Sequence, residues 1–193
     1  MPSIVLASTS RFRREILSRL GLPFEAIAPV CDETPLANES ALDTAIRLAR
    51  IKAHSLAQTH PEAVIIGSDQ VALLDGQQLG KPLTREIARQ MLTAMRGKTL
   101  HFHTALCVVN AAKKTYQEMC DITTVTMRNY SDTQIEHYLE REPDALHCAG
   151  SCKSEGLGGA MIESIQSNDP NALIGLPLFA LITLLQQEGI EIL

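Results

Sequence analysis

Apolar runs of strand length alternate with helix patterns in the first third of the chain, and this alternation constrains the fold most. Residues 3–7 predict a buried strand, and Ser10 is the expected N-cap of a helix behind it. Residues 24–28 and 63–69 predict two more strands, with a helix over 41–57 between them. Strands that alternate with helices form a sheet covered by helices, so we predict an α/β fold.

Two hairpin patterns add antiparallel strands to this sheet. Asp75 and Gly76 stand between two extended runs, which is a strong hairpin signal. The segments 99–110 and 115–128 read as a pair of long strands joined by AAKK. The sheet should therefore be mixed, and the resulting fold class is α/β with a mixed sheet.

Helix starts are also visible after the first hairpin pattern. Thr84 is placed to cap one helix, Ser131 and Gln134 form a capping-box pattern for another, and Pro177 suits the first turn of a last helix. The glycine- and serine-rich segment 148–159 predicts a loop rather than a regular element. No linker separates two independent parts, so we predict one domain over residues 1–193.

Composition excludes several classes of protein. The net charge of −5 argues against a general nucleic-acid binder, which needs an excess of Lys and Arg. No apolar run is long enough for a bilayer span, and no signal-peptide pattern is present. Five cysteines, an odd number, favour a reducing compartment over a disulfide framework. We predict a cytoplasmic protein with no membrane and no nucleic-acid partner.

The opening stretch carries unusual positive charge. Ser8 and Ser10 precede a predicted helix whose first turn holds Arg13 and Arg14. Arginines there oppose the helix dipole, which a bound polyanion such as a triphosphate would explain. The alternative interpretation is a solvated basic turn with a capping serine.

Acids and lysines follow in a second group. Asp69 stands at the carboxyl end of a predicted strand, where ligands bind in open α/β sheets. Glu33 lies in a loop, Lys52 on the preceding helix, and Lys81 after the hairpin. The carboxylates suit a divalent metal or an activated water, and the lysines suit phosphate. A helix-capping acid and a solvated turn are the alternatives for Asp69 and Glu33.

Taken in order, the motifs resemble the Maf nucleotide pyrophosphatases over essentially the whole chain. The matching stretches are ASTS with a double arginine (7–14), DET (32–34), GSDQ (67–70) and GKPLT (80–84). The loop HCAGSCKSEGLG (147–158) is similar to that of the YceF-type branch, whose members are 7-methyl-GTP pyrophosphatases.

The resemblance implies an elongated mixed sheet flanked by helices, in two lobes with a central cleft. It implies a divalent metal, Mg or Mn, a small-molecule nucleotide substrate and a homodimer. Position by position it implies the following roles: Asp69, Lys52 and Lys81 as catalytic residues; Ser8, Ser10, Arg13 and Arg14 for phosphate; Glu33 and Asp69 for metal; Phe12, Gln70 and Glu155 for substrate specificity.

The implied activity is hydrolysis of 7-methyl-GTP to 7-methyl-GMP and pyrophosphate, a house-cleaning role against modified nucleotides. An aromatic face at Phe12 suits the positively charged methylated base, and a carboxylate at Glu155 suits the guanine edge. Two alternatives stay open. One is a dTTP or UTP pyrophosphatase of the same family, and the other is a nucleotide-binding regulator of cell division.

Overall fold

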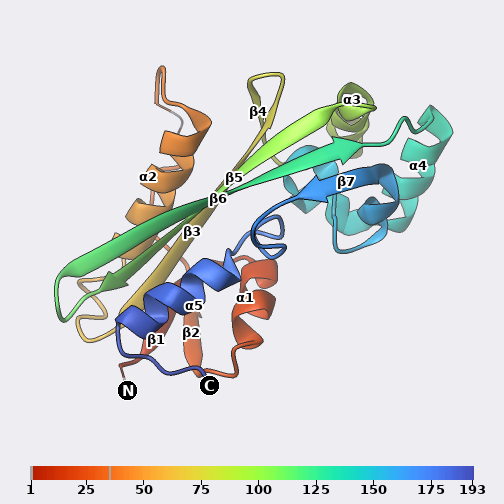
Figure 1. The fold of residues 1–193 in the computed structure, drawn as a ribbon. Helices are drawn as coiled ribbons and strands as arrows, with labels where there is room; N and C mark the ends of the chain where they lie inside the picture. Colours follow the sequence, from red (N-terminus) through yellow and green to blue (C-terminus); the bar gives the residue numbers. More distant parts are fainter. Residues whose placement is uncertain (1, 35) are drawn as a thin grey trace. The chain divides into compact units, whose positions relative to one another are not determined.

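The computed structural model of the chain describes residues 2–34 and 36–193 (Figure 1). The strands in the described residues are β1 (Ile4–Ala7), β2 (Phe24–Ile27), β3 (Val64–Leu74), β4 (Gln77–Leu79), β5 (Thr99–Asn110), β6 (Thr115–Met127) and β7 (Ile162–Gln166). The α-helices are α1 (Arg11–Ser18), α2 (Ala41–His54), α3 (Arg85–Met95), α4 (Asp132–Arg141) and α5 (Leu178–Gln187). Three short 3₁₀ helices are η1 (Pro143–His147), η2 (Ala149–Ser151) and η3 (Leu157–Met161).

The sheet mixes parallel and antiparallel pairs, which confirms the predicted fold class. Its described strands run in the order β2-β1-β3-β5-β6-β7, and β4 pairs with β3. β1 is parallel to β2 and β3, whereas β4 is antiparallel to β3 and β7 is antiparallel to β6. The predicted hairpin turn is present, with both Asp75 and Gly76 at positive φ.

By contacts the chain forms two compact units, which are described separately. Unit 1 consists of Met1–Gln70, His103–Asp121 and Asp169–Leu193, and unit 2 consists of Val71–Phe102 and Ile122–Asn168.

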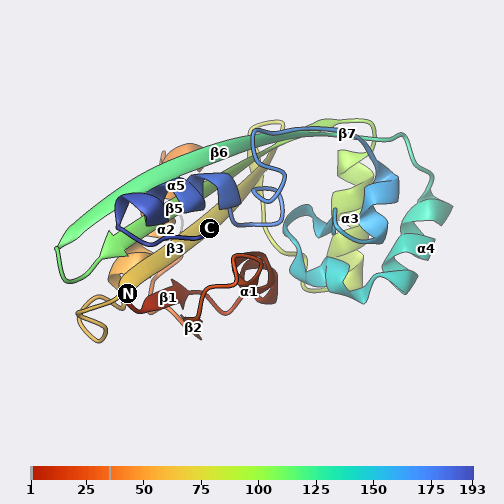
Figure 2. The same ribbon diagram turned by 60° about the horizontal axis from the view of Figure 1, so that its bottom comes forward.

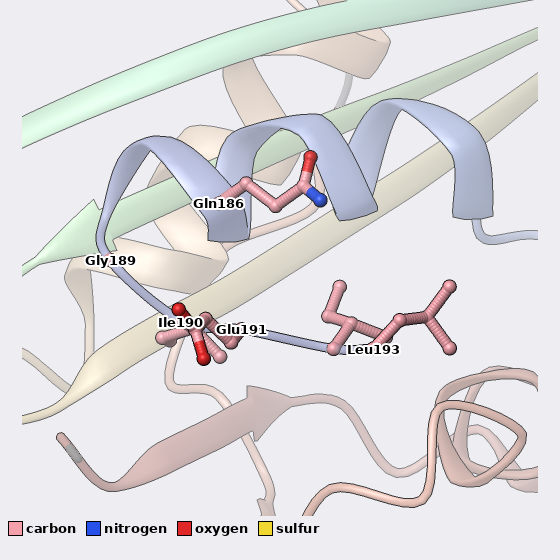
Figure 3. A pocket seen from close by; sticks show the side chains of 6 residues that line it. Gln186, Gly189, Ile190, Glu191 and Leu193 are labelled. Carbon is pink, nitrogen blue, oxygen red and sulfur yellow. The ribbon is translucent and has the colours of Figure 1, made fainter.

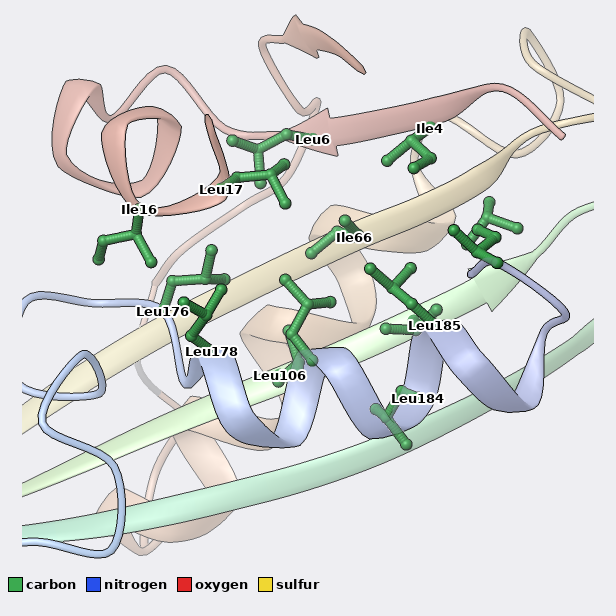
Figure 4. Close-up of a cluster of buried hydrophobic side chains, with 14 residues drawn as sticks. Ile4, Leu6, Ile16, Leu17, Ile66, Leu106, Leu176, Leu178, Leu184 and Leu185 are labelled. Atoms are coloured by element: carbon green, nitrogen blue, oxygen red, sulfur yellow. The ribbon is translucent and has the colours of Figure 1, made fainter. Parts of the chain in front are cut away.

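The core of unit 1 lies between α5 and the sheet. In this cluster Leu6 of β1, Ile66 of β3 and Leu106 of β5 are fully buried together with Leu181 and Leu185 of α5 (Figure 4). Each such side chain contributes about 1.5–3 kcal/mol by leaving water. The core contains aliphatic side chains and no Trp, as the composition predicts. Helices α2 and α5 cover opposite faces of these strands (Figure 2).

Unit 2 is organised around α3, α4 and the 3₁₀ helices. The Ser131 hydroxyl accepts a hydrogen bond from the Gln134 N–H, and the Gln134 side chain accepts one from the Ser131 N–H, which confirms the predicted capping box. The buried Tyr130 hydroxyl donates to the Leu92 carbonyl of α3 at 2.8 Å. Strand β7 completes this unit by pairing with β6.

The prediction was wrong in a few places. Helix α2 ends at His54 rather than at residue 57, because the chain continues as turns in which the Ser55 hydroxyl bonds the Lys52 carbonyl. Strand β7 was not predicted, and segment 148–159 contains two 3₁₀ helices. Pro177 is the N-cap of α5 rather than a first-turn residue. No helix in the described part of the chain has the length and apolarity that a membrane crossing requires.

Candidate active site

Strand β3 presents its GSDQ residues alternately to two faces. Successive side chains of a strand point to opposite faces, so Gly67 and Asp69 share one face, and Ser68 and Gln70 share the other. A Cβ at Gly67 would lie 2.7 Å from the Ala53 nitrogen, and closer still to the Ala49 carbonyl oxygen. Only glycine therefore lets α2 approach β3 this closely, and the approach brings α2 to the Asp69 side.

Lys52 of α2 bridges two carboxylates on that face. Its ammonium lies 2.6 Å from Asp69 Oδ1 and 2.7 Å from Glu33 Oε1. The Lys52 and Asp69 side chains are 7% and 11% exposed, whereas Glu33 is 60% exposed. A buried lysine paired with two acids fixes both carboxylates beside each other, with Glu33 open to solvent. The structure thus brings together three residues that the sequence placed in different elements.

The donor set of this cluster suits a divalent cation. Mg²⁺ is commonly held by one or two carboxylates together with substrate phosphate oxygens and water. Asp69 and Glu33 supply the two carboxylates. Across residues 2–34 and 36–193, no group of three His, Cys, Asp or Glu side chains forms a self-sufficient metal site. A cation held here would therefore need phosphate or water oxygens as further ligands.

Arg13 brings positive charge from α1 toward the same acids. Its Nε donates a 2.8 Å hydrogen bond to the Gly175 carbonyl. Burial lowers the pKa of the Arg13 guanidinium, and the negative charges of Asp69 and Glu33 raise it in part. Because guanidinium stays protonated far above neutral pH, Arg13 is a fixed positive charge close to both carboxylates.

The turn before α1 folds as its sequence predicts. Ser10 is the N-cap and accepts the Arg13 N–H, while Ser8 is buried and accepts the Ser10 N–H at 3.1 Å. Arg14 is exposed. Phe12 is half-buried, and the Arg11 guanidinium lies 4.8 Å above its ring centroid. The first turn of α1 contains no acid, so its positive charge is not neutralised within that turn.

On the other face of β3, Ser68 and Gln70 contact the loop between β7 and α5. The Gln70 amide nitrogen lies 3.0 Å from each of three acceptors, Thr104 Oγ1, the Ala172 carbonyl and the Leu173 carbonyl. The Ser68 hydroxyl lies 2.9 Å from the Gly175 carbonyl oxygen and 2.8 Å from the Ala105 carbonyl oxygen of β5. Ser68, Thr104 and Gly175 were not among the predicted site residues. The one signal available was a glycine two residues before Pro177.

The two predicted site residues of unit 2 are exposed. Lys81 follows β4, and Glu155 lies in the loop between η2 and η3, where the Ser154 hydroxyl donates to it at 3.3 Å. Lys153 of that loop pairs with Glu142 at 3.1 Å and with Asp144 at 2.9 Å, and both acids raise its pKa. Lys153 therefore anchors the loop.

A hollow near the C-terminus is lined by residues that lie far along the chain from the predicted site residues. It is lined by Gln186 and residues 189–193, and it contains none of the predicted site residues (Figure 3). Its lining offers one carboxylate and no cationic side chain. The hollow therefore lacks the positive charge that would bind a nucleoside triphosphate.

The comparisons with known proteins agree on the family of this chain. Residues 3–188 match the model of the family described as Maf-like protein. A protein of Chromobacterium violaceum named 7-methyl-GTP pyrophosphatase is 64% identical over 190 residues, which is 98% of each chain. One of Methylobacillus flagellatus with the same name is 52% identical over the full length of both chains. The solved structure of the Staphylococcus aureus Ham1 protein has 12% identity and a TM-score of 0.48, covering 66% of this chain and 72% of that one, and this likeness is too low to carry an argument.

Proposed function

Because this chain belongs to the Maf family, we propose that it hydrolyses 7-methyl-GTP to 7-methyl-GMP and pyrophosphate. The name of the 64% identical relative supports the substrate. The observation that carries the chemistry is the bridge of Lys52 between Asp69 and Glu33 beside Arg13. Clearance of modified nucleotides would be the physiological purpose.

The geometry suits a reaction in which water attacks the α-phosphorus and pyrophosphate leaves. Asp69 is the acceptor for the proton of the attacking water, and Lys52 holds its carboxylate in one orientation at 2.6 Å. Arg13 lies near enough to Asp69 and Glu33 for their negative charges to raise its pKa, and it supplies fixed positive charge for the phosphates. Ser8 and Ser10 shape the turn in front of α1. Positioning and charge stabilisation are the main tasks of a protein in phosphoryl transfer.

A divalent metal, Mg or Mn, completes the proposal. Asp69 and Glu33 are the residues that would hold it. When bound, the metal would lower the pKa of a coordinated water and neutralise phosphate charge. Lys52 pairs with both acids and thereby holds the two carboxylates beside each other.

Base recognition is proposed for three residues. Phe12 offers an aromatic face to the positively charged 7-methylguanine, a cation–π contact of about 0.5–2 kcal/mol. Gln70 and the exposed Glu155 keep the specificity roles that the family resemblance implies. Lys81 keeps its implied catalytic role, and Arg14 keeps its role toward phosphate. We also propose a cytoplasmic homodimer in which residues 1–193 act as one domain. The five free cysteines support the compartment.

The first test is a substrate panel. The purified chain with Mg is given 7-methyl-GTP, GTP, UTP or dTTP separately, and pyrophosphate release is measured. The Asp69→Asn variant keeps the side-chain volume but removes the proton acceptor. Asp43→Asn makes the same change at an exposed position of α2.

The outcomes separate the alternatives. Release from 7-methyl-GTP well above the others, lost in Asp69→Asn and kept in Asp43→Asn, supports the proposal. A preference for UTP or dTTP would keep the mechanism and overturn the substrate. Nucleotide binding without release by the unaltered chain would point to a regulator.

A further inference from the structure

The loop between β7 and α5 is fastened to unit 1 at several points. Asp169 Oδ1 accepts hydrogen bonds from the backbone and side-chain nitrogens of Asn171, and Oδ2 accepts one from the Phe179 N–H of α5. Arg19, just after α1, donates to Asn171 Oδ1 at 2.8 Å. The loop thus links the beginning of α5 to the end of α1. Asp169 and Asn171 are buried, so these hydrogen bonds are shielded from water.

Gln70 fastens the middle of the same loop to β3. Its amide nitrogen has two N–H groups, and they face the carbonyls of Ala172 and Leu173 and the Thr104 hydroxyl. The Thr104 hydroxyl itself donates to the Ala172 carbonyl at 3.0 Å. All donor capacity of the Gln70 side chain is therefore used within the protein. Only its Oε1 acceptor is available for any ligand.

Ser68 and Arg13 meet at one backbone atom of the loop. The Gly175 carbonyl accepts from Arg13 Nε at 2.8 Å. The Ser68 hydroxyl lies 2.9 Å from the same oxygen and 2.8 Å from the Ala105 carbonyl oxygen, so its single proton is shared between a carbonyl of β5 and the loop. Ser68 is completely buried. Gly175 has φ +120°, a conformation that residues with a Cβ rarely adopt. Ser68 and Gln70 thus both contact the loop whose Gly175 carbonyl accepts from Arg13.

We propose that Ser68 and Gln70 are positioning residues that act through residues 169–177 to orient Arg13 toward the phosphates. This inference rests on the proposed function for the role of Arg13. Strand β3 then positions both cationic side chains of the site, Lys52 and Arg13. Asp69 on one face fixes Lys52, while its two neighbours on the other face fix Arg13. The effect of Gln70 on substrate choice would follow from its hold on the loop rather than from contact with the base.

A double-mutant cycle tests the connection. Ser68→Ala removes the hydroxyl, and Arg13→Lys keeps the charge but loses the Nε–H that reaches Gly175. Ser68→Ala alone should lower kcat/KM for 7-methyl-GTP about 5- to 30-fold, the range of one or two lost interactions. In the Arg13→Lys background the same change should lower it less than about twofold, because coupled residues are not additive.

Matched controls separate positioning from general loss of structure. Tyr130→Phe also removes a buried hydroxyl that donates to a carbonyl, and Ser18→Ala removes an exposed hydroxyl from α1. Both should keep kcat/KM within about twofold of the unaltered chain. If Ser68→Ala does not fold, Gln70→Glu replaces it. That change keeps the size but puts an acceptor against two carbonyls, and it should show the same coupling to Arg13→Lys.

Binding of inorganic pyrophosphate, measured by calorimetry, gives a readout that does not need turnover. If the chain turns over none of the nucleotides but the pyrophosphate cycle shows coupling, the proposed function fails and the positioning inference stands. If turnover is present and the effects of Ser68→Ala and Arg13→Lys multiply independently in both assays, the positioning inference is overturned. It is also overturned if Arg13→Lys leaves pyrophosphate binding and turnover unchanged.

Discussion

Gly67→Ala tests whether close packing of α2 on β3 sets the distance between Lys52 and Asp69. The new Cβ would stand 2.7 Å from the nitrogen and 2.9 Å from the Cβ of Ala53. Non-bonded atoms prefer about 3.5–4.0 Å, so helix and strand must separate by roughly 1 Å. The obstructing atoms belong to the backbone or to a Cβ, so no side-chain rotation relieves the clash.

The separation should affect both stability and catalysis. Overpacking of this kind costs about 1–3 kcal/mol of unfolding free energy, which corresponds to a Tm lowered by about 2–12 °C in a chain of this size. A shift of about 1 Å also takes the 2.6 Å bond between Lys52 and Asp69 beyond good hydrogen-bond length. Misplacement on this scale costs about 100-fold in rate.

Thermal unfolding and pyrophosphate release from 7-methyl-GTP are the assays for Gly67→Ala. Gly80→Ala is the control for Tm, because a Cβ there meets nothing within 4 Å and φ is not positive. A Gly67→Ala protein with unchanged Tm and unchanged kcat/KM would refute the argument that this glycine sets the position of Lys52.

Three further predictions concern pH and metal. Burial raises the pKa of the Cys107 and Cys148 thiols from 9.0 to about 12. The unfolded chain therefore loses these protons first, so the free energy of unfolding should be unaffected by them below pH 9 and should fall as pH rises from 9 toward 12. A lower Tm at pH 10.5 than at pH 8, with a smaller difference in Cys107→Ala, would show this, and a flat Tm would contradict it. The hydrogen bonds from Arg47 lower the pKa of Glu39 to about 2, so their stabilising effect is present above pH 4.5 and is lost as pH falls through 2. NMR titration should return this carboxyl toward 4.5 in Arg47→Met, and an unmoved pKa would show that the ion pair is not the cause. EDTA should abolish pyrophosphate release, added Mg or Mn should restore it, and full activity in EDTA would remove the metal from the proposal.

Local signals predicted the elements of this fold well. Ser10, Thr84 and Ser131 cap α1, α3 and α4 as expected, since a cap depends on residues three apart in sequence. Strand β7 was missed because four of its five residues are exposed, so it has no apolar alternation to detect. Pro177 was misplaced by one residue, and the carboxylate that assists the start of α5 comes from Asp169.

The candidate site was predictable only in its parts. The residue types of Asp69, Lys52 and Glu33 were visible in the sequence, and the structure adds that one ammonium joins both acids. The partners of Arg13 were not visible. Gly175 lies 162 residues further along the chain, and it contributes a backbone carbonyl, which no residue type encodes. Contacts of this kind depend on tertiary packing.

The alternation of the GSDQ side chains between the two faces of β3 limits the insertions and deletions that this strand can accept. A substitution in β3 changes one side chain, but insertion or deletion of a single residue between Val64 and Gly67 would exchange the two faces for every later position of the strand. Asp69 would then turn toward α5, and a side chain would replace Gly67 against α2. Length changes should therefore be absent from this strand in functional descendants, although loops elsewhere can tolerate them.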